Sequence, residues 1–394
     1  MGIIYKLIRY IFRLIVAIAR IIILFTLTLF VFDKVTTSIP SKVKNSKKPN
    51  KNILIGIAEH PHDEDPNYIP GGDSSVHNDL IRVLKESGYR VKIITYNPRS
   101  IRGNKFMIWL IGMPYLYSTY LKQISSQFEI IICDSGVVWD LRGNTYINLF
   151  HFSYIEYTKN VSKYYDPLSI INGLINGIIQ IKGSKYTFNV AVSEYLRDKL
   201  KNVGIFIDVT ISNGIDSDIF KPLIKRKKDS KILYLGGYSY FGKGFDIIRV
   251  LGKLGNKITC ITNHFEKHWD NIEFLPPVSH ELTPKTYTKY QITVYPSRFE
   301  SCQMVPLESM ACGTPVVISN VGIGQELVKV IPEFVVAGYD SRSIGEYNDR
   351  IKLILGNYEH YSKLARKYVV SNFNLIAFEK NWLTIVRKVY ENTL

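Results

Sequence analysis

The chain has 394 residues, of which 46% are apolar, and a formal net charge of +16. A single hydrophobic core rarely organises so many residues, so we expect two globular domains. The charge is unevenly placed, because residues 1–52 hold ten Lys or Arg and one acidic residue, a net +9, which leaves +7 for the rest. The remaining basic residues are mixed with acidic ones, which argues against a nucleic-acid-binding protein.

The cysteines and the most histidine-rich segment give little sign of disulfides or metal. Four cysteines are scattered without a C-x-x-C pair, so we expect reduced, unpaired thiols: Cys133, Cys260, Cys302 and Cys312. The segment from His60 to Asp65 holds two histidines and three acidic residues in a Pro-rich loop, without partners at recognised metal spacing. We expect it to contact an acceptor or solvent and expect no metal site.

The N-terminus predicts a membrane-anchor helix over residues 1–33. Leu14 to Phe32 is apolar except for Arg20, a length that just spans a bilayer core. Two arrangements fit: a single span with snorkelling arginines, or an amphipathic helix in the membrane plane. A cleaved signal peptide fits less well, because the apolar stretch is long and no A-x-A-like site follows. Four basic residues share one helical face: Lys6, Arg9, Arg13 and Arg20.

Residues 34–51 are basic and contain Pro40 and Pro49, which predicts an extended tether near the membrane surface. Positive charge flanks both sides of the apolar stretch, so charge alone leaves its orientation open. We expect a membrane-associated protein with its catalytic domains on the cytoplasmic face.

From residue 52 onward, short apolar runs alternate with segments of helical spacing. In the first half a helix is expected over Ser75–Ser87, ended by Gly88, and the expected strands are Ile53–Ala58, Val91–Tyr96, Ile130–Cys133, Ile147–His151, Asn189–Val192 and Val209–Ile211. In the second half the expected strands are Ile232–Leu235, Ile258–Ile261, Ile292–Tyr295 and Val316–Ile318. One helix is expected to begin at Gly244. The other helices expected there cover Leu282–Lys289, Pro306–Cys312, Gly324–Val330 and Leu375–Tyr390.

This alternation predicts an α/β fold of two doubly wound, mostly parallel sheets. Residues 221–231 are charged and aperiodic, with Pro222 among them, and we place the domain boundary there. The expected units are an N-terminal domain over 52–222, a C-terminal domain over 223–370, and a final helix over 371–394. Ligands should bind at the carboxyl ends of the strands.

The most informative stretch is YPSRFESCQMVPLESMACGTPVV, from Tyr295 to Val317, in which Glu300 and Glu308 lie eight positions apart. It resembles the signature of the retaining glycosyltransferases of the family 4 type, the glycosyl transferases group 1, which have the GT-B fold. The resemblance implies two Rossmann-like domains facing a cleft, with the last helix crossing back to the first domain. It also implies hexosyl transfer from a nucleotide-diphosphate sugar to a hydroxyl acceptor, without a metal or other cofactor.

The resemblance assigns roles to both glutamates. A carboxylate at a strand end can accept hydrogen bonds from sugar hydroxyls, the role implied for Glu300. A carboxylate in the following helix can hold both ribose hydroxyls while the positive end of that helix faces the diphosphate, the role implied for Glu308. Neighbouring positions marked as donor-binding are Ser297, Arg298, Gln303, Met304 and Val305.

A second segment, LGGYSYFGKGF from Leu235 to Phe245, resembles the family's glycine turn and Lys-Gly pair. Lys243 is expected to neutralise the departing diphosphate. An arginine usually follows the glycine at the place of Gly237, but this chain has Tyr238. Arg298 is the candidate to supply the missing cation.

Four further positions complete the predicted site. Gly71 and Gly72 resemble the N-terminal glycine turn whose backbone N–H groups approach the donor phosphates. His151, at a strand end, occupies the place of a family histidine near the reacting carbon, although a structural role fits equally well. Gln303 stands where the family has glycine, so we expect an altered sugar pocket.

The expected partners are a nucleotide sugar, a membrane and a glycolipid or glycan acceptor, with lipid-linked acceptors favoured because an anchored enzyme is concentrated near them. Protein glycans are the competing acceptor. Two other classes stay open: a nucleotide-sugar-binding module that has lost transfer, and an adaptor that uses only the basic tail.

Overall fold

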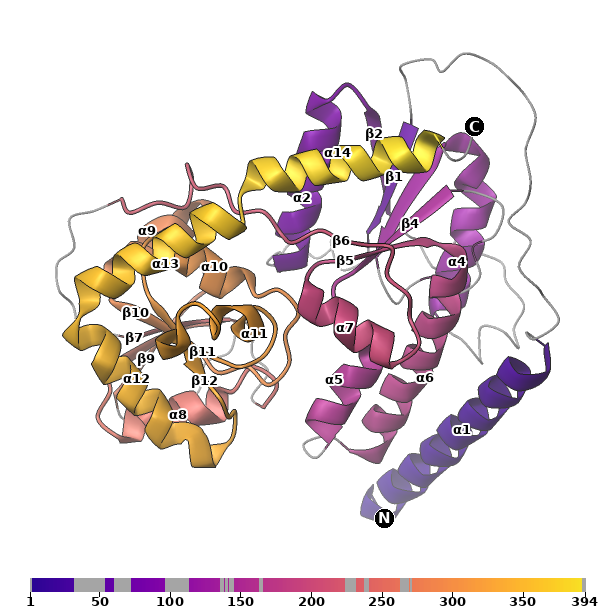
Figure 1. The fold of residues 1–394 in the computed structure, drawn as a ribbon. Helices are drawn as coiled ribbons and strands as arrows, with labels where there is room; N and C mark the ends of the chain where they lie inside the picture. The colour runs from indigo at the N-terminus through magenta and orange to yellow at the C-terminus, as the bar shows by residue number, and fades with distance from the viewer. Residues whose placement is uncertain are drawn as a thin grey trace.

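The computed structural model describes residues 2–31, 54–59, 72–95, 113–134, 138, 141, 145–162, 166–223, 232–236, 241–262, 269 and 271–391. Two parallel six-stranded sheets with helices packed around them form two lobes, and a long N-terminal helix lies against the first (Figure 1). The predicted tether over 34–51 and the segment from His60 to Asp65 lie outside the described residues.

The first sheet has the strand order β2-β1-β3-β4-β5-β6, and every neighbouring pair is parallel. Its strands are β1 (Leu54–Glu59), β2 (Arg90–Thr95), β3 (Ile130–Asp134), β4 (Thr145–Phe150), β5 (Phe188–Ala191) and β6 (Val209–Thr210). Central strands such as β3 are nearly continuous runs of buried Ile, as expected for strands covered on both faces. Successive strands are added on one side of β1 first and then on the other, so the winding of the sheet reverses between β1 and β3. Sheets of this kind bind ligands at such a reversal.

The helices of the first lobe are α2 (Gly72–Glu86), α4 (Met113–Ile124), α5 (Tyr154–Val161), α6 (Pro167–Gly183) and α7 (Glu194–Asn202). Side chains that accept hydrogen bonds from first-turn N–H groups begin three of them: Ser153, Asp166 and Ser193. Helices α5 and α6 pack unusually closely. A Cβ on Gly173 would lie 2.1 Å from Oγ1 of Thr158, so this approach needs a glycine.

The second sheet has the order β12-β11-β10-β7-β8-β9, also entirely parallel. Its strands are β7 (Ile232–Leu235), β8 (Ile258–Ile261), β9 (Ile272–Leu275), β10 (Ile292–Tyr295), β11 (Val316–Ser319) and β12 (Val335–Val336). The direction of winding reverses between β7 and β10, so the segments that follow these two strands meet at one edge. These are the segments that carry Lys243 and Glu300.

The helices of the second lobe are α8 (Phe245–Lys253), α9 (Thr283–Lys289), α10 (Met304–Ala311), α11 (Gly324–Leu327), α12 (Ile344–Gly356) and α13 (Tyr358–Asn372). Both sheets are parallel as predicted.

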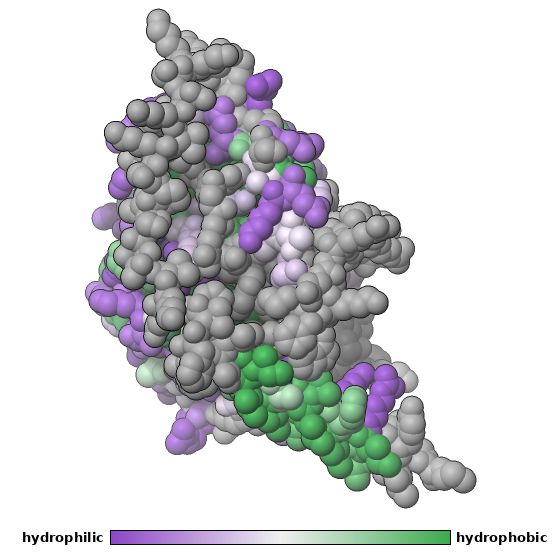
Figure 2. All heavy atoms as spheres, turned by 90° about the vertical axis from the view of Figure 1, so that its right-hand side faces the viewer, coloured by the Kyte–Doolittle hydropathy of each residue, from purple (hydrophilic) through white to green (hydrophobic). Residues whose placement is uncertain are grey.

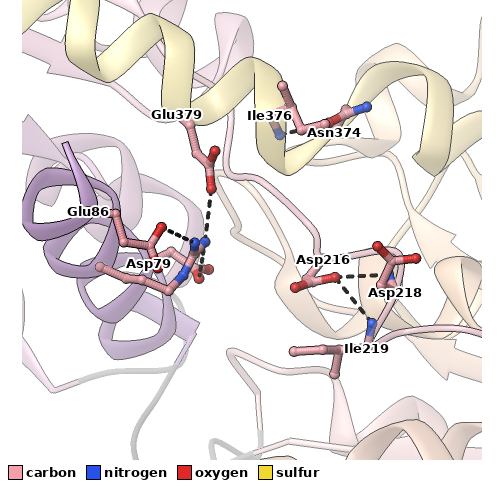
Figure 3. Close-up of polar contacts among 9 residues, drawn as sticks. Asp79, Glu86, Asp216, Asp218, Ile219, Asn374, Ile376 and Glu379 are labelled. Carbon is pink, nitrogen blue, oxygen red and sulfur yellow. Dashed lines mark hydrogen bonds and ion pairs between the residues drawn. The ribbon is translucent and has the colours of Figure 1, made fainter.

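The chain crosses between the lobes twice, and the two crossings lie side by side. Near the first, the backbone N–H of Ile215 donates to the carbonyl of Phe373 at 2.8 Å, next to the second crossing. Gly214 permits the contact, because a Cβ there would lie 2.9 Å from side-chain atoms of Leu375 and Phe378. Asp216 then accepts hydrogen bonds from two following backbone N–H groups and shapes the turn (Figure 3).

After the second crossing, α14 (Leu375–Glu391) runs across the first lobe and packs on α2 (Figure 1). Arg82 of α2 donates to Glu379 of α14 at 3.0 Å and to Glu86 at 3.1 Å, with Asp79 close by (Figure 3). Trp382 of α14 is fully buried. The C-terminal helix therefore belongs, in space, to the first lobe.

The N-terminal helix α1 (Gly2–Val31) lies along α6. Ile21 and Ile23 pack on a cluster around Ile175 and Ile179, and Ala17 is buried. In the described part of the chain, no helix combines the length and apolarity needed to cross a bilayer.

Candidate active site

A cavity of about 1500 Å³ lies between the lobes, at the carboxyl ends of both sheets. The first lobe lines it with α2, α5, α6 and the residues that follow β4, and the second lobe with the segments after β7, β9 and β10 and with the start of α10. Lys243, Glu300, Glu308 and His151 all line this cavity, so the structure brings together residues that are far apart in sequence.

Lys243 and Glu300 form an ion pair at the cavity wall. Nζ of Lys243 lies 2.6 Å from Oε1 of Glu300, and that oxygen also accepts a hydrogen bond from Oγ of Ser297 at 2.8 Å. Burial acts to lower the pKa of Lys243, but the Glu300 carboxylate outweighs it and holds this pKa well above its usual range. Lys243 therefore stays cationic at all physiological pH values.

Gly244 fixes the turn that presents Lys243. Its φ is +71°, and a Cβ would lie 2.0 Å from the carbonyl oxygen of Pro296, the residue that follows β10. The glycine thus allows the Lys243 turn and the β10 loop to touch backbone to backbone.

Glu308 is 6% exposed and lies in α10, whose N-terminus faces the cavity through Met304 and Val305. Its Oε2 accepts a hydrogen bond from the hydroxyl of Tyr287 at 2.7 Å, and its Oε1 lies 3.7 Å from Nε2 of His280. The nearby Glu308 carboxylate raises the pKa of His280. One carboxylate oxygen is thus held by a buried tyrosine, while the other lies beside the imidazole of His280.

The side chain of Gln303 turns from the cavity floor toward the loop between β11 and α11. Its Nε2 donates to the carbonyl of Val321 and its Oε1 accepts from the N–H of Ile323, both at 2.8 Å. Gly322 makes room for it, since a Cβ there would lie 2.4 Å from Oε1. Gln303 still lines the cavity, but its amide braces a neighbouring loop, so a changed sugar preference stays a prediction.

Arg298 requires a correction. Its side chain is 1% exposed and pairs with both carboxylate oxygens of Asp246, at 2.8 and 2.7 Å, and with the carbonyl of Phe241. It is not among the residues that line the cavity, so it does not supply the second cation expected at the diphosphate. The guanidinium instead ties the β10 loop to the start of α8.

The remaining predicted residues are only partly described. His151 follows β4 and lines the cavity, with its ring 5.3 Å from that of His77 in an edge-to-face contact. Gly72 is the first residue of α2. Gly71, Gly237 and Tyr238 lie outside the described residues, so the predicted glycine turns stay predictions.

The structure adds four cavity or near-cavity residues that sequence reasoning missed. Tyr287 and His280 meet at Glu308, as described above. Asn213 and Ser301 are 3% and 5% exposed and line the cavity, and among the described residues Oδ1 of Asn213 and Oγ of Ser301 have no hydrogen-bond partner. Buried polar atoms are nearly always satisfied, so these two fit a hydroxyl-bearing ligand. Asn213 lies between β6 and the first crossing to the second lobe, and only the tertiary fold brings it to the cavity.

Among the residues that the structure describes, no group of three or more His, Cys, Asp or Glu side chains is arranged to hold a metal ion. The segment from His60 to Asp65 falls outside that part of the chain.

Comparison with known proteins bears on the fold and on the second lobe. Residues 255–368 match the family model described as "Glycosyl transferases group 1". The chain is 36% identical over 99 residues to a D-inositol 3-phosphate glycosyltransferase of Geodermatophilus obscurus and 28% identical over 149 residues to one of Gordonia bronchialis. These matches cover 25% and 37% of this chain and only 22% and 30% of the relatives.

Solved structures resemble nearly the whole described chain. The sucrose-phosphate synthase of Thermosynechococcus elongatus superposes with a TM-score of 0.67 at 16% identity, covering 86% of this chain and all of that one. Anabaena HepE, solved in complex with UDP-glucose, gives a TM-score of 0.59 at 12% identity, covering 85% of this chain and all of its own. At this identity the likeness shows the fold, and it confirms the predicted pair of Rossmann-like domains. The chain thus has the GT-B fold, and its residues 255–368 are similar to the glycosyl transferases group 1 family.

Proposed function

We propose that this protein is a retaining glycosyltransferase that moves a hexose from a nucleoside-diphosphate sugar to a hydroxyl of a lipid-linked or membrane-associated glycan. The observation that carries the proposal is the Lys243–Glu300 pair at the winding reversal of the second sheet, beside the N-terminus of α10. The family match over residues 255–368 and the solved complex of HepE with UDP-glucose support a sugar nucleotide as donor.

In this proposal the donor diphosphate lies at the N-terminus of α10, where the backbone N–H groups of Met304 and Val305 and the helix dipole favour an anion. Oε1 of Glu308 accepts a ribose hydroxyl in place of His280. Lys243, kept cationic by its neighbour, stabilises the negative charge that grows on the diphosphate as the glycosidic bond breaks.

The donor sugar lies between Glu300 on one side and Asn213 and Ser301 on the other. Glu300 accepts hydrogen bonds from its hydroxyls, and the two unsatisfied buried groups contact others. As the anomeric carbon gains oxocarbenium character, the acceptor hydroxyl attacks from the face that the diphosphate leaves, and its proton passes to a phosphate oxygen. The new bond then keeps the anomeric configuration of the donor.

The acceptor faces the first lobe. Along α6, three polar side chains at helical spacing line the cavity, Ser169, Asn172 and Asn176, and they suit a polyhydroxylated headgroup. His151 lines the same side of the cavity, near the proposed position of the donor sugar. We place the protein on a membrane with its catalytic lobes on the cytoplasmic face, and proteolysis of intact against permeabilised cells tests that orientation.

The direct test offers a panel of nucleotide sugars, with extracted glycolipids as acceptors, to the full chain in detergent, and follows released nucleotide. Glu308→Ala should lose turnover with the donor that the wild type uses. Glu359→Ala is the matched control, because Glu359 is exposed on α13 and does not line the cavity. The proton NMR coupling of the product's anomeric hydrogen then reports whether configuration is kept.

Donor binding without turnover for every acceptor would reveal a binding module that has lost transfer. Equal turnover by wild type and Glu308→Ala would exclude the proposed donor site.

A further inference from the structure

The outward face of α1 is apolar from Leu7 to Ile22. Seven large apolar side chains between 44% and 66% exposed follow one another at helical spacing: Leu7, Ile8, Ile11, Phe12, Ile15, Ile18 and Ile22. At about 100° per residue they fall on one side of the helix. Figure 2 shows this side as a continuous hydrophobic surface at the lower end of the molecule. Such a surface is larger than isolated exposed residues explain and marks an interaction site.

The polar side of α1 is basic. Arg9 and Arg13 are exposed and, by the same helical count, point away from the apolar side. A helix with an apolar face and an arginine-bearing polar face is the form that lies in a membrane interface, with the apolar side sunk among the acyl chains and the cations among the headgroups.

The packing of α1 favours this orientation over a crossing one. Ala17 is buried, and Ile21 and Ile23 pack on the cluster of Ile175 and Ile179 in α6, so the helix is laid along the first lobe while its apolar side stays uncovered. A helix that left the lobe to cross the bilayer would expose the Ile175 and Ile179 cluster that it now covers.

Helix α6 connects this surface to the cavity. One side of α6 carries Ile175 and Ile179 toward α1, and another carries Asn172 and Asn176 into the cavity wall. Helices α1 and α6, each about 10 Å across, therefore lie between the apolar surface and the wall that faces the acceptor.

We propose that α1 binds in the plane of an anionic lipid bilayer, with its outward apolar face sunk at the headgroup boundary and α6 resting beside the membrane surface. The occupant is a lipid surface and not a second copy of this chain, because residues 1–52 carry a net +9 and two such segments repel each other. This inference concerns attachment and does not need the proposed transfer reaction to be correct.

The test measures binding of the purified full chain to preformed vesicles by co-sedimentation. Vesicles of phosphatidylcholine with phosphatidylglycerol should bind the wild type, and phosphatidylcholine alone or high salt should weaken binding. The double substitution Phe12→Glu, Ile15→Glu should lower the partition coefficient at least about tenfold, because two apolar anchors are lost. The matched control is Phe206→Glu, Leu254→Glu, which adds the same charges at exposed apolar residues outside α1 and should bind as the wild type does.

Four outcomes would overturn the inference. Failure of the wild type to bind anionic vesicles, or equal binding by the α1 variant, would remove the lipid surface as occupant. A dimer in sedimentation equilibrium that Phe12→Glu, Ile15→Glu dissociates would assign the face to a second copy. Retention of the wild type on vesicles after an alkaline carbonate wash would indicate a spanning helix. Vesicle binding is measured without turnover, so it stands or falls separately from the enzyme assay.

Discussion

Substituting Gly244 by alanine tests how strictly the active site depends on backbone contact between the Lys243 turn and the loop after β10. Gly244 has a φ of +71°, and a Cβ built on it lies 2.0 Å from the carbonyl oxygen and 2.7 Å from the carbonyl carbon of Pro296. The left-handed conformation costs a residue with a side chain about 1–2 kcal/mol. Relieving a clash with backbone atoms adds about 1–3 kcal/mol, so the total loss in free energy of unfolding should be about 2–5 kcal/mol.

Gly255 provides the matched control. Its φ of +90° imposes the same kind of conformational cost, but a Cβ there meets no heavy atom within 4 Å. Urea unfolding of Gly244→Ala and Gly255→Ala, followed by tryptophan fluorescence, isolates the clash as the difference between the variants. Nucleotide affinity, measured by calorimetry, should fall in Gly244→Ala alone, because the alanine displaces Lys243 from Glu300. Losses in stability that agree within about 0.5 kcal/mol would refute the argument from the Pro296 contact.

Three further predictions concern charged side chains. Lys243→Met should reduce nucleotide release at least about 100-fold, as expected when a charge that stabilises the leaving group is removed, and a loss below tenfold would contradict that role. A double-mutant cycle on Arg82→Ala and Glu379→Ala in urea should give a coupling of about 0.2–1 kcal/mol, since the pair is partly exposed; strict additivity would show that it does not fasten α14. The nearby Glu308 carboxylate raises the pKa of His280, so the stabilisation of the folded state by this pair is full below the unfolded-state pKa of about 6.5 and is lost as pH rises through the folded-state pKa. The melting temperature of the wild type should therefore exceed that of His280→Gln in acid and match it in alkali, and a gap independent of pH would refute the pairing.

Most of the strands that sequence analysis predicted are apolar runs with buried side chains, and it also predicted the exposed edge strand β2 and the two-residue strand β6. Long apolar runs such as Ile130–Cys133 and Ile292–Tyr295 stand out without any knowledge of their neighbours. Two strands at the edges of the second sheet were missed: β9, which has Glu273 exposed, and β12, which has only two residues. Short or half-exposed strands depend on their sheet and leave little local signal.

The candidate site divides in a similar way. The spacing of Glu300 and Glu308 placed one after a strand and the other in the next helix, where the structure has them. Arg298 lies in the same motif, but its partner Asp246 is 52 positions away, and only the tertiary fold turns the guanidinium away from the cavity. Tyr287 was unpredictable for the same reason, since its bond to Glu308 joins two helices.

The path of α14 has a consequence for engineering. Because this helix follows the second lobe in sequence but packs on α2 of the first, a chimera with a foreign donor lobe should exchange roughly residues 223–372 and retain α14 from the parent of the first lobe. A simple fusion at the boundary near residue 222 would import a foreign helix onto the native α2. It would also replace the buried Trp382 by the corresponding residue of the foreign helix, which would then have to pack in the core of a first lobe from another protein.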